Sequence, residues 1–194
     1  MKDQYHHGDL KQALIEKGLE YISENGIESL SLRRLATLCG VSNAAPYAHF
    51  KDKEELIQAI QSYVTDEFVQ ILTDCINKYQ NTPELLSQLG CEYVLFFIKK
   101  PLYYSFLFSP SLTNMKIYTE KDKRGNVAPF ELFKGTAYEV LSHFGIPESE
   151  AENKITAMWA LVHGLAGICS LQSTNSSLRS EEKIKAIINS VKVV

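Results

Sequence analysis

Residues 31–53 have the sequence SLRRLATLCGVSNAAPYAHFKDK, and the fold expected for the whole chain follows from this stretch. Ser31 is a residue type that caps helix N-termini, and the leucines and alanine after it recur at helical spacing. Gly40 can adopt the left-handed conformation that ends a helix. After Ser42, residues 43–47 suffice for about one and a half further turns. Two short helices joined by a tight turn predict a helix-turn-helix, whose second helix enters the DNA major groove.

Four pieces of sequence in and around this stretch form a more specific pattern. They are Gly26, the LRRLA of residues 32–36, the Gly-Val-Ser of residues 40–42, and residues 47–56 with an aromatic-x-His-Phe-x-x-Lys arrangement. Together they resemble the DNA-binding domain of the tetracycline-repressor (TetR) family of bacterial transcription regulators. The resemblance covers residues 5 to about 60 closely. It implies a three-helix DNA-binding domain at residues 1–52 and a helical effector-binding and dimerisation domain at residues 53–194.

Hydrophobic residues recur with a helical period along the remaining chain, and no alternating pattern of useful length predicts a strand. The fold class is therefore predicted to be all-α, with about nine helices in total. Residues 109–126, which contain a proline and a charged EKDKRGN run, are predicted as a loop with one helical turn. Seven helices are expected outside the helix-turn-helix. The first begins near Asp9 and the last near Ser180, and the five between them cover about 53–79, 85–99, 102–108, 128–144 and 147–171.

The charge balance excludes a generally basic protein that coats nucleic acid. The chain has a formal charge of −3. Residues 1–53 contain seven Lys or Arg and seven Asp or Glu, so their net charge is zero. Affinity for DNA would then have to come from individually placed contacts and from the pairing of two subunits.

Composition gives no indication of a cofactor, a metal or a membrane. The four cysteines are far apart and form no C-x-x-C pair, so neither a zinc site nor a disulfide framework is predicted. We expect buried free thiols in a reducing cytosol. The polar start, residues 1–11, does not resemble a signal peptide, and the most apolar run, 157–171, is too short for a membrane span. A cytoplasmic location is predicted.

Candidate DNA contacts fall into base readers and phosphate binders. Groove geometry favours Arg with guanine and Asn with adenine, which selects Arg33 and Asn43, whereas alanines can contact only apolar groups such as thymine methyls. The resemblance places Tyr47, His49 and Lys53 on phosphates. Phe50 is expected to pack in the core, and for Arg34 a DNA contact and a surface ion pair remain open alternatives. The predicted DNA-contacting residues are Ser31, Arg33, Ser42, Asn43, Ala44, Ala45, Tyr47, His49 and Lys53.

An aromatic set near the middle of the chain and one motif near residue 160 suggest an effector site. Trp159-Ala-Leu-Val-His163-Gly164 resembles the Trp-His-Gly (WHG) motif of one class of C-terminal domain in the family. The functional interpretation is a pocket for an apolar or aromatic small molecule. The alternative is ordinary core packing, with His163 as a hydrogen-bonded core histidine, which we favour for that residue. The candidate pocket residues are Phe96, Phe97, Tyr103, Tyr104, Trp159 and His163.

Small residues at helical spacing near the end of the chain predict a dimer interface. A stripe of alanine and glycine lets a second helix approach closely, and the last helix has an isoleucine-rich face. Two copies of these helices would form a four-helix interface. Alternatively, the same faces pack inside one subunit. The candidate interface residues are Ala157, Ala160, Gly164, Gly167, Ile184, Ile187, Ile188 and Val191.

These observations predict a homodimeric, sequence-specific DNA-binding transcription regulator. The protein is predicted to be a repressor, which a small-molecule effector releases from a palindromic operator. A regulator of the same fold without an inducer is the alternative, and dense packing of the aromatic set would favour it. An enzyme is disfavoured, because no nucleophile–base pair, phosphate loop or metal motif occurs at a suggestive spacing.

Overall fold

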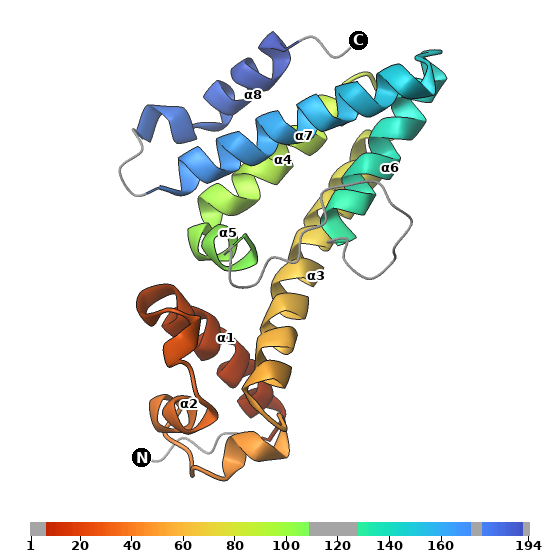
Figure 1. Cartoon of the computed structure of the whole chain (residues 1–194). Coiled ribbons are helices and arrows are strands. Elements are labelled where there is room, and N and C mark those ends of the chain that lie inside the picture. Colours follow the sequence, from red (N-terminus) through yellow and green to blue (C-terminus); the bar gives the residue numbers. More distant parts are fainter. Residues whose placement is uncertain (1–6, 109–127, 172–175, 192–194) are drawn as a thin grey trace. The chain divides into compact units, whose positions relative to one another are not determined.

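The computed structural model describes residues 7–108, 128–171 and 176–191, and these contain helices and no strands (Figure 1). This confirms the predicted all-α class; the predicted loop at 109–126 lies outside the described residues. The α-helices are α1 (His7–Asn25), α2 (Leu32–Leu38), α3 (Lys53–Tyr79), α4 (Leu85–Lys99), α5 (Pro101–Leu107), α6 (Ala128–His143), α7 (Glu148–Ser170) and α8 (Glu181–Ser190), and the short 3-10 helices are η1 (Ile27–Ser29), η2 (Ala45–Ala48) and η3 (Ser176–Arg179).

The helices group into two compact units. The first contains α1, η1, α2 and η2, with α3 up to Val64 and α5 from Ser105 on. The second contains α3 from Thr65, α5 up to Tyr104, and α4, α6, α7 and α8. Because α3 contributes to both units, the domain boundary expected after residue 52 stays a prediction.

The first unit has a small core in which α1, α2 and the start of α3 pack together. Leu14, Leu35 and Leu56 are completely buried in it. Gly18 makes the packing of α1 on α3 possible, because a Cβ built on it would lie 2.8 Å from Ile60 Cδ1. The position of α2 is therefore fixed by packing on α1 and α3, and neither of these two helices carries a predicted base contact.

In the second unit, α4 is the central helix. It packs against α6, α7 and α8, and its side chains from Tyr93 to Phe97 are all buried. Such a helix needs apolar residues on all sides, which explains the run of large hydrophobic residues in its sequence. Gly90 allows the close approach: a Cβ there would lie 3.2 Å from Val162 Cγ1 in α7 and 3.4 Å from Ile188 Cδ1 in α8.

Candidate nucleic-acid interface

The first helix of the helix-turn-helix is held by its two ends and by one buried face. Its N-cap Ser31 accepts a hydrogen bond from the backbone N–H of Arg34 at 3.2 Å, as the sequence predicted. At the other end Gly40 has φ +68°, and the N–H of Val41 donates to the carbonyl of Ala36 at 2.9 Å. This is the left-handed helix ending that was expected of a glycine here. It directs the chain abruptly from α2 into the second element.

The second element is shorter than predicted. Instead of a helix over residues 43–47, Asn43 and Ala44 form a turn, and η2 is a single 3-10 segment, Ala45–Ala48. The cause is Pro46, which has no N–H to donate and lies buried at the start of η2. The remaining bonds reach back three residues, for example from the N–H of Tyr47 to the carbonyl of Ala44 at 3.1 Å. The prediction of a helix over residues 43–47 is wrong because it did not allow for this proline.

The predicted base readers lie at the surface. Arg33, Ser42, Asn43 and Ala44 are exposed, and Ala45 is half-buried. Among the described residues, the Arg33 guanidinium makes no hydrogen bond or ion pair. Ser31 is also exposed, but its hydroxyl already serves as the cap of α2. The side chains with unused hydrogen-bonding groups on this surface thus include an arginine and an asparagine, the two types that read guanine and adenine.

The predicted phosphate binders have different surroundings. The Tyr47 side chain is 51% exposed, and His49 is half-buried beside the Phe50 ring. Lys53 Nζ donates to the carbonyl oxygen of Glu28 at 3.1 Å, so a phosphate would have to compete with this bond. Tyr47 is therefore the phosphate candidate that needs the least rearrangement.

The start of α3 already holds negative groups. The Oδ1 atom of Asp52 accepts from the N–H of Glu55 at 2.9 Å, and the Glu55 carboxylate accepts from the N–H of Lys51 at 2.6 Å. These carboxylates occupy positions that an anion would take at a helix N-terminus. The helix start is consequently a weaker phosphate site than the sequence suggested.

Two neighbouring side chains have structural partners. Phe50 is 2% exposed, which confirms its expected place in the core, and Lys11 Nζ lies 5.9 Å from its ring centroid. Arg34 is exposed, with its guanidinium carbon 5.9 Å from the centroid of the Tyr21 ring. This cation–π contact is a role for Arg34 that neither of its two sequence-based interpretations included.

In the second unit, the aromatic set forms a dense cluster. Phe97 is completely buried, with its ring edge-to-face to Phe68 at 4.8 Å and to Tyr104 at 5.3 Å. Phe96, 2% exposed, stacks on Phe68 at 4.6 Å. Neither phenylalanine lines either of the two cavities described below. Their assignment to an effector pocket stays a prediction, and the observed packing gives them a structural role.

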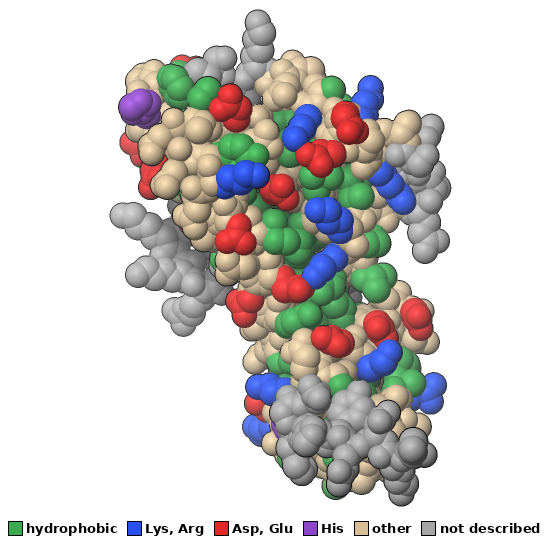
Figure 2. Space-filling view, turned by 180° about the vertical axis from the view of Figure 1, so that it is seen from behind, with side chains coloured by type: hydrophobic (Ala, Val, Ile, Leu, Met, Phe, Trp, Pro, Cys, Tyr) green, Lys and Arg blue, Asp and Glu red, His purple; other side chains and the backbone are tan. Residues whose placement is uncertain are grey.

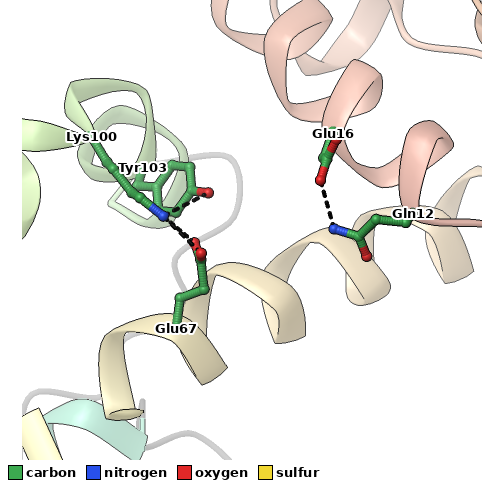
Figure 3. Close-up of polar contacts among 5 residues, drawn as sticks. All are labelled: Gln12, Glu16, Glu67, Lys100 and Tyr103. Atoms are coloured by element: carbon green, nitrogen blue, oxygen red, sulfur yellow. Dashed lines mark hydrogen bonds and ion pairs between the residues drawn. The ribbon is translucent and has the colours of Figure 1, made fainter. Parts of the chain in front are cut away.

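Tyr103 belongs to a polar cluster between α3 and the α4–α5 junction (Figure 3). The Lys100 ammonium donates to both oxygens of Glu67, at 2.7 and 2.6 Å, and to the Tyr103 hydroxyl at 3.5 Å. The ammonium also lies 4.8 Å from the centroid of the Tyr103 ring. The pair is partly exposed, so its contribution to stability is modest. Figure 3 also shows Gln12 donating to Glu16 along α1.

His163 is hydrogen-bonded through both ring nitrogens. The Tyr104 hydroxyl lies 3.2 Å from Nε2 and donates to the backbone carbonyl of His163 at 3.4 Å, so it accepts from an Nε2–H. Nδ1 can then accept from the Tyr93 hydroxyl at 3.2 Å. The Trp159 ring stacks on the imidazole at 4.7 Å. This arrangement suits a neutral imidazole and gives the half-buried His163 a hydrogen-bonded structural role.

This environment predicts a pH dependence of stability. Burial lowers the pKa of His163 below 6.5, so between its folded-state pKa and 6.5 the unfolded chain binds more protons than the folded one. The stabilisation is complete above pH 6.5 and is lost as the pH falls below it. Urea unfolding at pH 7.5 and 5.0 should show a larger loss of unfolding free energy for the wild type than for His163→Gln. Equal losses would contradict the neutral-histidine interpretation.

The predicted interface residues divide into exposed and internal ones. On α7, Ala157, Ala160 and Gly164 are exposed, and Ile168 and Leu171, which the sequence analysis did not select, extend this apolar stripe at 50% and 59% exposure. The stripe therefore keeps its place as the proposed contact surface.

The other predicted interface residues mostly serve the chain's own core. A Cβ on Gly167 would lie 2.6 Å from the Tyr104 hydroxyl, so this glycine faces a neighbouring helix of the same chain. Ile184 and Ile188 are 0% and 9% exposed, packed inside the chain. For these three residues the structure matches the alternative of packing within one subunit. Ile187 is half-buried and Val191 is 45% exposed.

No helix in the described ranges is long and apolar enough to cross a membrane. In the same ranges, no group of three or more His, Cys, Asp or Glu side chains is arranged to hold a metal ion.

Comparisons with known proteins agree with this geometry. Residues 14–60 match the family described as "Bacterial regulatory proteins, tetR family". The chain is 42% identical to the tetracycline repressor protein class C of Escherichia coli over 50 residues. This aligned stretch is 26% of this chain and 23% of that protein. It is 28% identical to an HTH-type transcriptional regulator of Staphylococcus aureus (strain USA300) over 87 residues. This second stretch is 45% of this chain and 46% of that protein. The matches thus span less than half the length of these curated relatives.

The fold comparison extends over nearly the whole chain. PfmR, a TetR family transcriptional regulator from Thermus thermophilus, superposes with a TM-score of 0.66 at 17% sequence identity, over 91% of this chain and 94% of that one. The chain therefore has the fold of TetR-type regulators. Residues 14–60 are therefore similar to the DNA-binding domain of tetR-family regulatory proteins.

Proposed function

We propose that the protein is a homodimeric repressor that binds a palindromic operator and leaves it when a small molecule binds its second unit. The observation that carries the proposal is the capped α2–η2 pair, which lies within the matched residues 14–60 and presents Arg33, Asn43 and Tyr47 to solvent. Because operator DNA would be its target, we place its action in the cytoplasm.

Dimerisation is proposed from the exposed stripe on α7. Ala157, Ala160 and Gly164 lie on it with Ile168 and Leu171, and an exposed apolar surface of this kind gains stability when it is covered. A second copy of α7 fits, since a Cβ on Gly164 would meet nothing within 4 Å and a helix can approach closely there. A dimer is also needed for affinity, because the charge of residues 1–53 sums to zero. Over the face of the molecule seen in Figure 2, basic and acidic side chains are interspersed.

The WHG-type motif has a structural role in this proposal. His163 and Trp159 engage Tyr93 and Tyr104, so the motif connects α7 with α4 and α5. A ligand at this place would have to displace completed hydrogen bonds. The dense packing of Phe96 and Phe97 counts for the alternative, a regulator without an inducer. An effector is therefore expected at another place in the second unit, and the test that follows decides between the two.

The function is tested by incubating the purified protein with fragmented DNA of the source genome and sequencing the retained fragments, with and without added metabolite extract. We expect one palindromic sequence to be enriched, and the enrichment to fall when extract is present. Tyr47→Ala should abolish it with an unchanged dimer mass, because this side chain is 51% exposed and supports no core. If no sequence is enriched at moderate salt, DNA-binding regulation is contradicted; enrichment that no extract changes would favour a regulator without an inducer.

A further inference from the structure

The second unit contains a hollow whose lining includes no residue of the candidate DNA interface. It lies between α4, α6, α7 and α8 and has a volume of about 320 Å³. Its walls include Gly90, Phe133, Met158, Val162 and Ile188. A volume of this size lies at the lower end of the range for small-molecule sites.

The walls are apolar and carry no charge. Among the described residues that line the hollow, none has an ionisable side chain. Gly90 contributes only backbone to this wall, and α4 packs closely there on Val162 and Ile188, 3.2 and 3.4 Å from where its Cβ would lie. Phe144 and Val191, at the edge, are 53% and 45% exposed although both are large and apolar. These surfaces would gain from contact with an apolar molecule.

Two polar groups line the hollow. The Ser87 hydroxyl donates to the carbonyl of Glu84 at 3.1 Å, so its oxygen can still accept a hydrogen bond. The Asn189 amide makes no hydrogen bond to the described residues, and it can donate and accept. A single hydroxyl, ester or ketone end on a ligand would match these groups.

The neighbouring recess makes an anionic ligand unfavourable. This second hollow shares Pro83, Val140 and Phe144 with the first and has a volume of about 600 Å³. Glu139 and His143 lie on its wall, and the Glu139 carboxylate would repel an anion. A charged group of either sign in the apolar hollow would also lose its hydration without a partner.

We propose that the hollow between α4, α6, α7 and α8 binds a neutral, largely apolar small molecule with one hydrogen-bonding end. As the site of the effector it rests on the proposed function; as a binding site it does not. Fatty carboxylates and alkylammonium ions with an alkyl chain as long as that of a neutral ligand are expected to bind more weakly than that ligand.

The test uses N-phenyl-1-naphthylamine, a neutral dye that fluoresces in apolar surroundings, with the full-length protein at pH 7.5. Its displacement is compared for 1-decanol, decanoate and decylammonium, which differ in the head group. We expect decanol to displace the dye at a concentration at least tenfold below that needed with either charged compound. Equal potency of a charged compound would overturn the proposed ligand class.

Variants locate the site. Gly90→Leu should fill the hollow and weaken dye binding at least tenfold, whereas Gly135→Ala, where an added Cβ meets nothing within 4 Å, should leave it unchanged. If Gly90→Leu does not fold, Ser87→Phe, at a half-buried wall position, takes its place. Undiminished binding in the filled variant, or binding that appears only when the protein dissociates into monomers, would overturn the site.

The two proposals fail separately in this design. A protein that enriches an operator but binds neither dye nor decanol at the hollow refutes the site and leaves DNA regulation standing. A protein that binds decanol there but enriches no DNA refutes the regulator and leaves the site standing.

Discussion

Replacing Arg33 by alanine is expected to lower the affinity of the dimer for its operator by roughly 30-fold or more, without changing the free energy of unfolding. A bidentate arginine–guanine contact is worth about 1–3 kcal/mol, and a dimer makes it twice. The side chain is exposed and has no hydrogen-bonding partner among the described residues, so its removal leaves the fold intact. Fluorescence anisotropy with the enriched fragment, at one fixed salt concentration, measures the loss.

Arg34→Ala is the matched control, because it removes the same charge one position along α2. Its guanidinium lies near the Tyr21 ring, so we expect a smaller loss that is similar for operator and unrelated DNA. The Arg33 loss, in contrast, should be confined to the operator. Equal losses for the two variants, or an equal loss on unrelated DNA, would show that Arg33 does not read a base.

Phe97→Ala is expected to lower the free energy of unfolding of the second unit by about 3–5 kcal/mol, the usual cost of truncating a buried phenylalanine. The ring is 0% exposed and packs edge-to-face with Phe68, Phe96 and Tyr104, so its loss leaves a cavity and removes these aromatic contacts. A loss of this size is a large part of the stability of a typical domain. Urea unfolding followed by circular dichroism measures it.

Phe144→Ala makes the same chemical change at a position that is 53% exposed. We expect a loss below about 1 kcal/mol, since little buried area is removed. Similar losses at Phe97 and Phe144 would mean that the aromatic cluster is not packed as described.

The long helices were predictable because their signals are local and repeated. The bounds predicted for α3 and α4 agree with the structure, since each has a sustained apolar period and a clear break at the end. The cap at Ser31 and the glycine ending at Gly40 were also predictable, because both depend on residues within one helical turn.

The errors concern features that depend on a single residue or on distant neighbours. η2 is a 3-10 segment because Pro46 lacks a donor, a local signal that the sequence does contain. The pattern of small residues on α7 indicated close approach but not the neighbour, and Gly167 turned out to accommodate Tyr104 of the same chain. The apolar period of the last helix likewise predicts a buried face but not its neighbour, and the structure shows that Ile184 and Ile188 are buried within the chain.

The central claim, that two copies of the α2–η2 pair bind successive turns of one operator, is tested most directly by hydroxyl-radical footprinting on the enriched fragment. The account predicts two protected backbone patches on one face of the duplex, with centres about 10 base pairs or a multiple of one turn apart. In the Arg33→Ala dimer both patches should weaken together. A single patch, or uniform protection along the fragment, would contradict it.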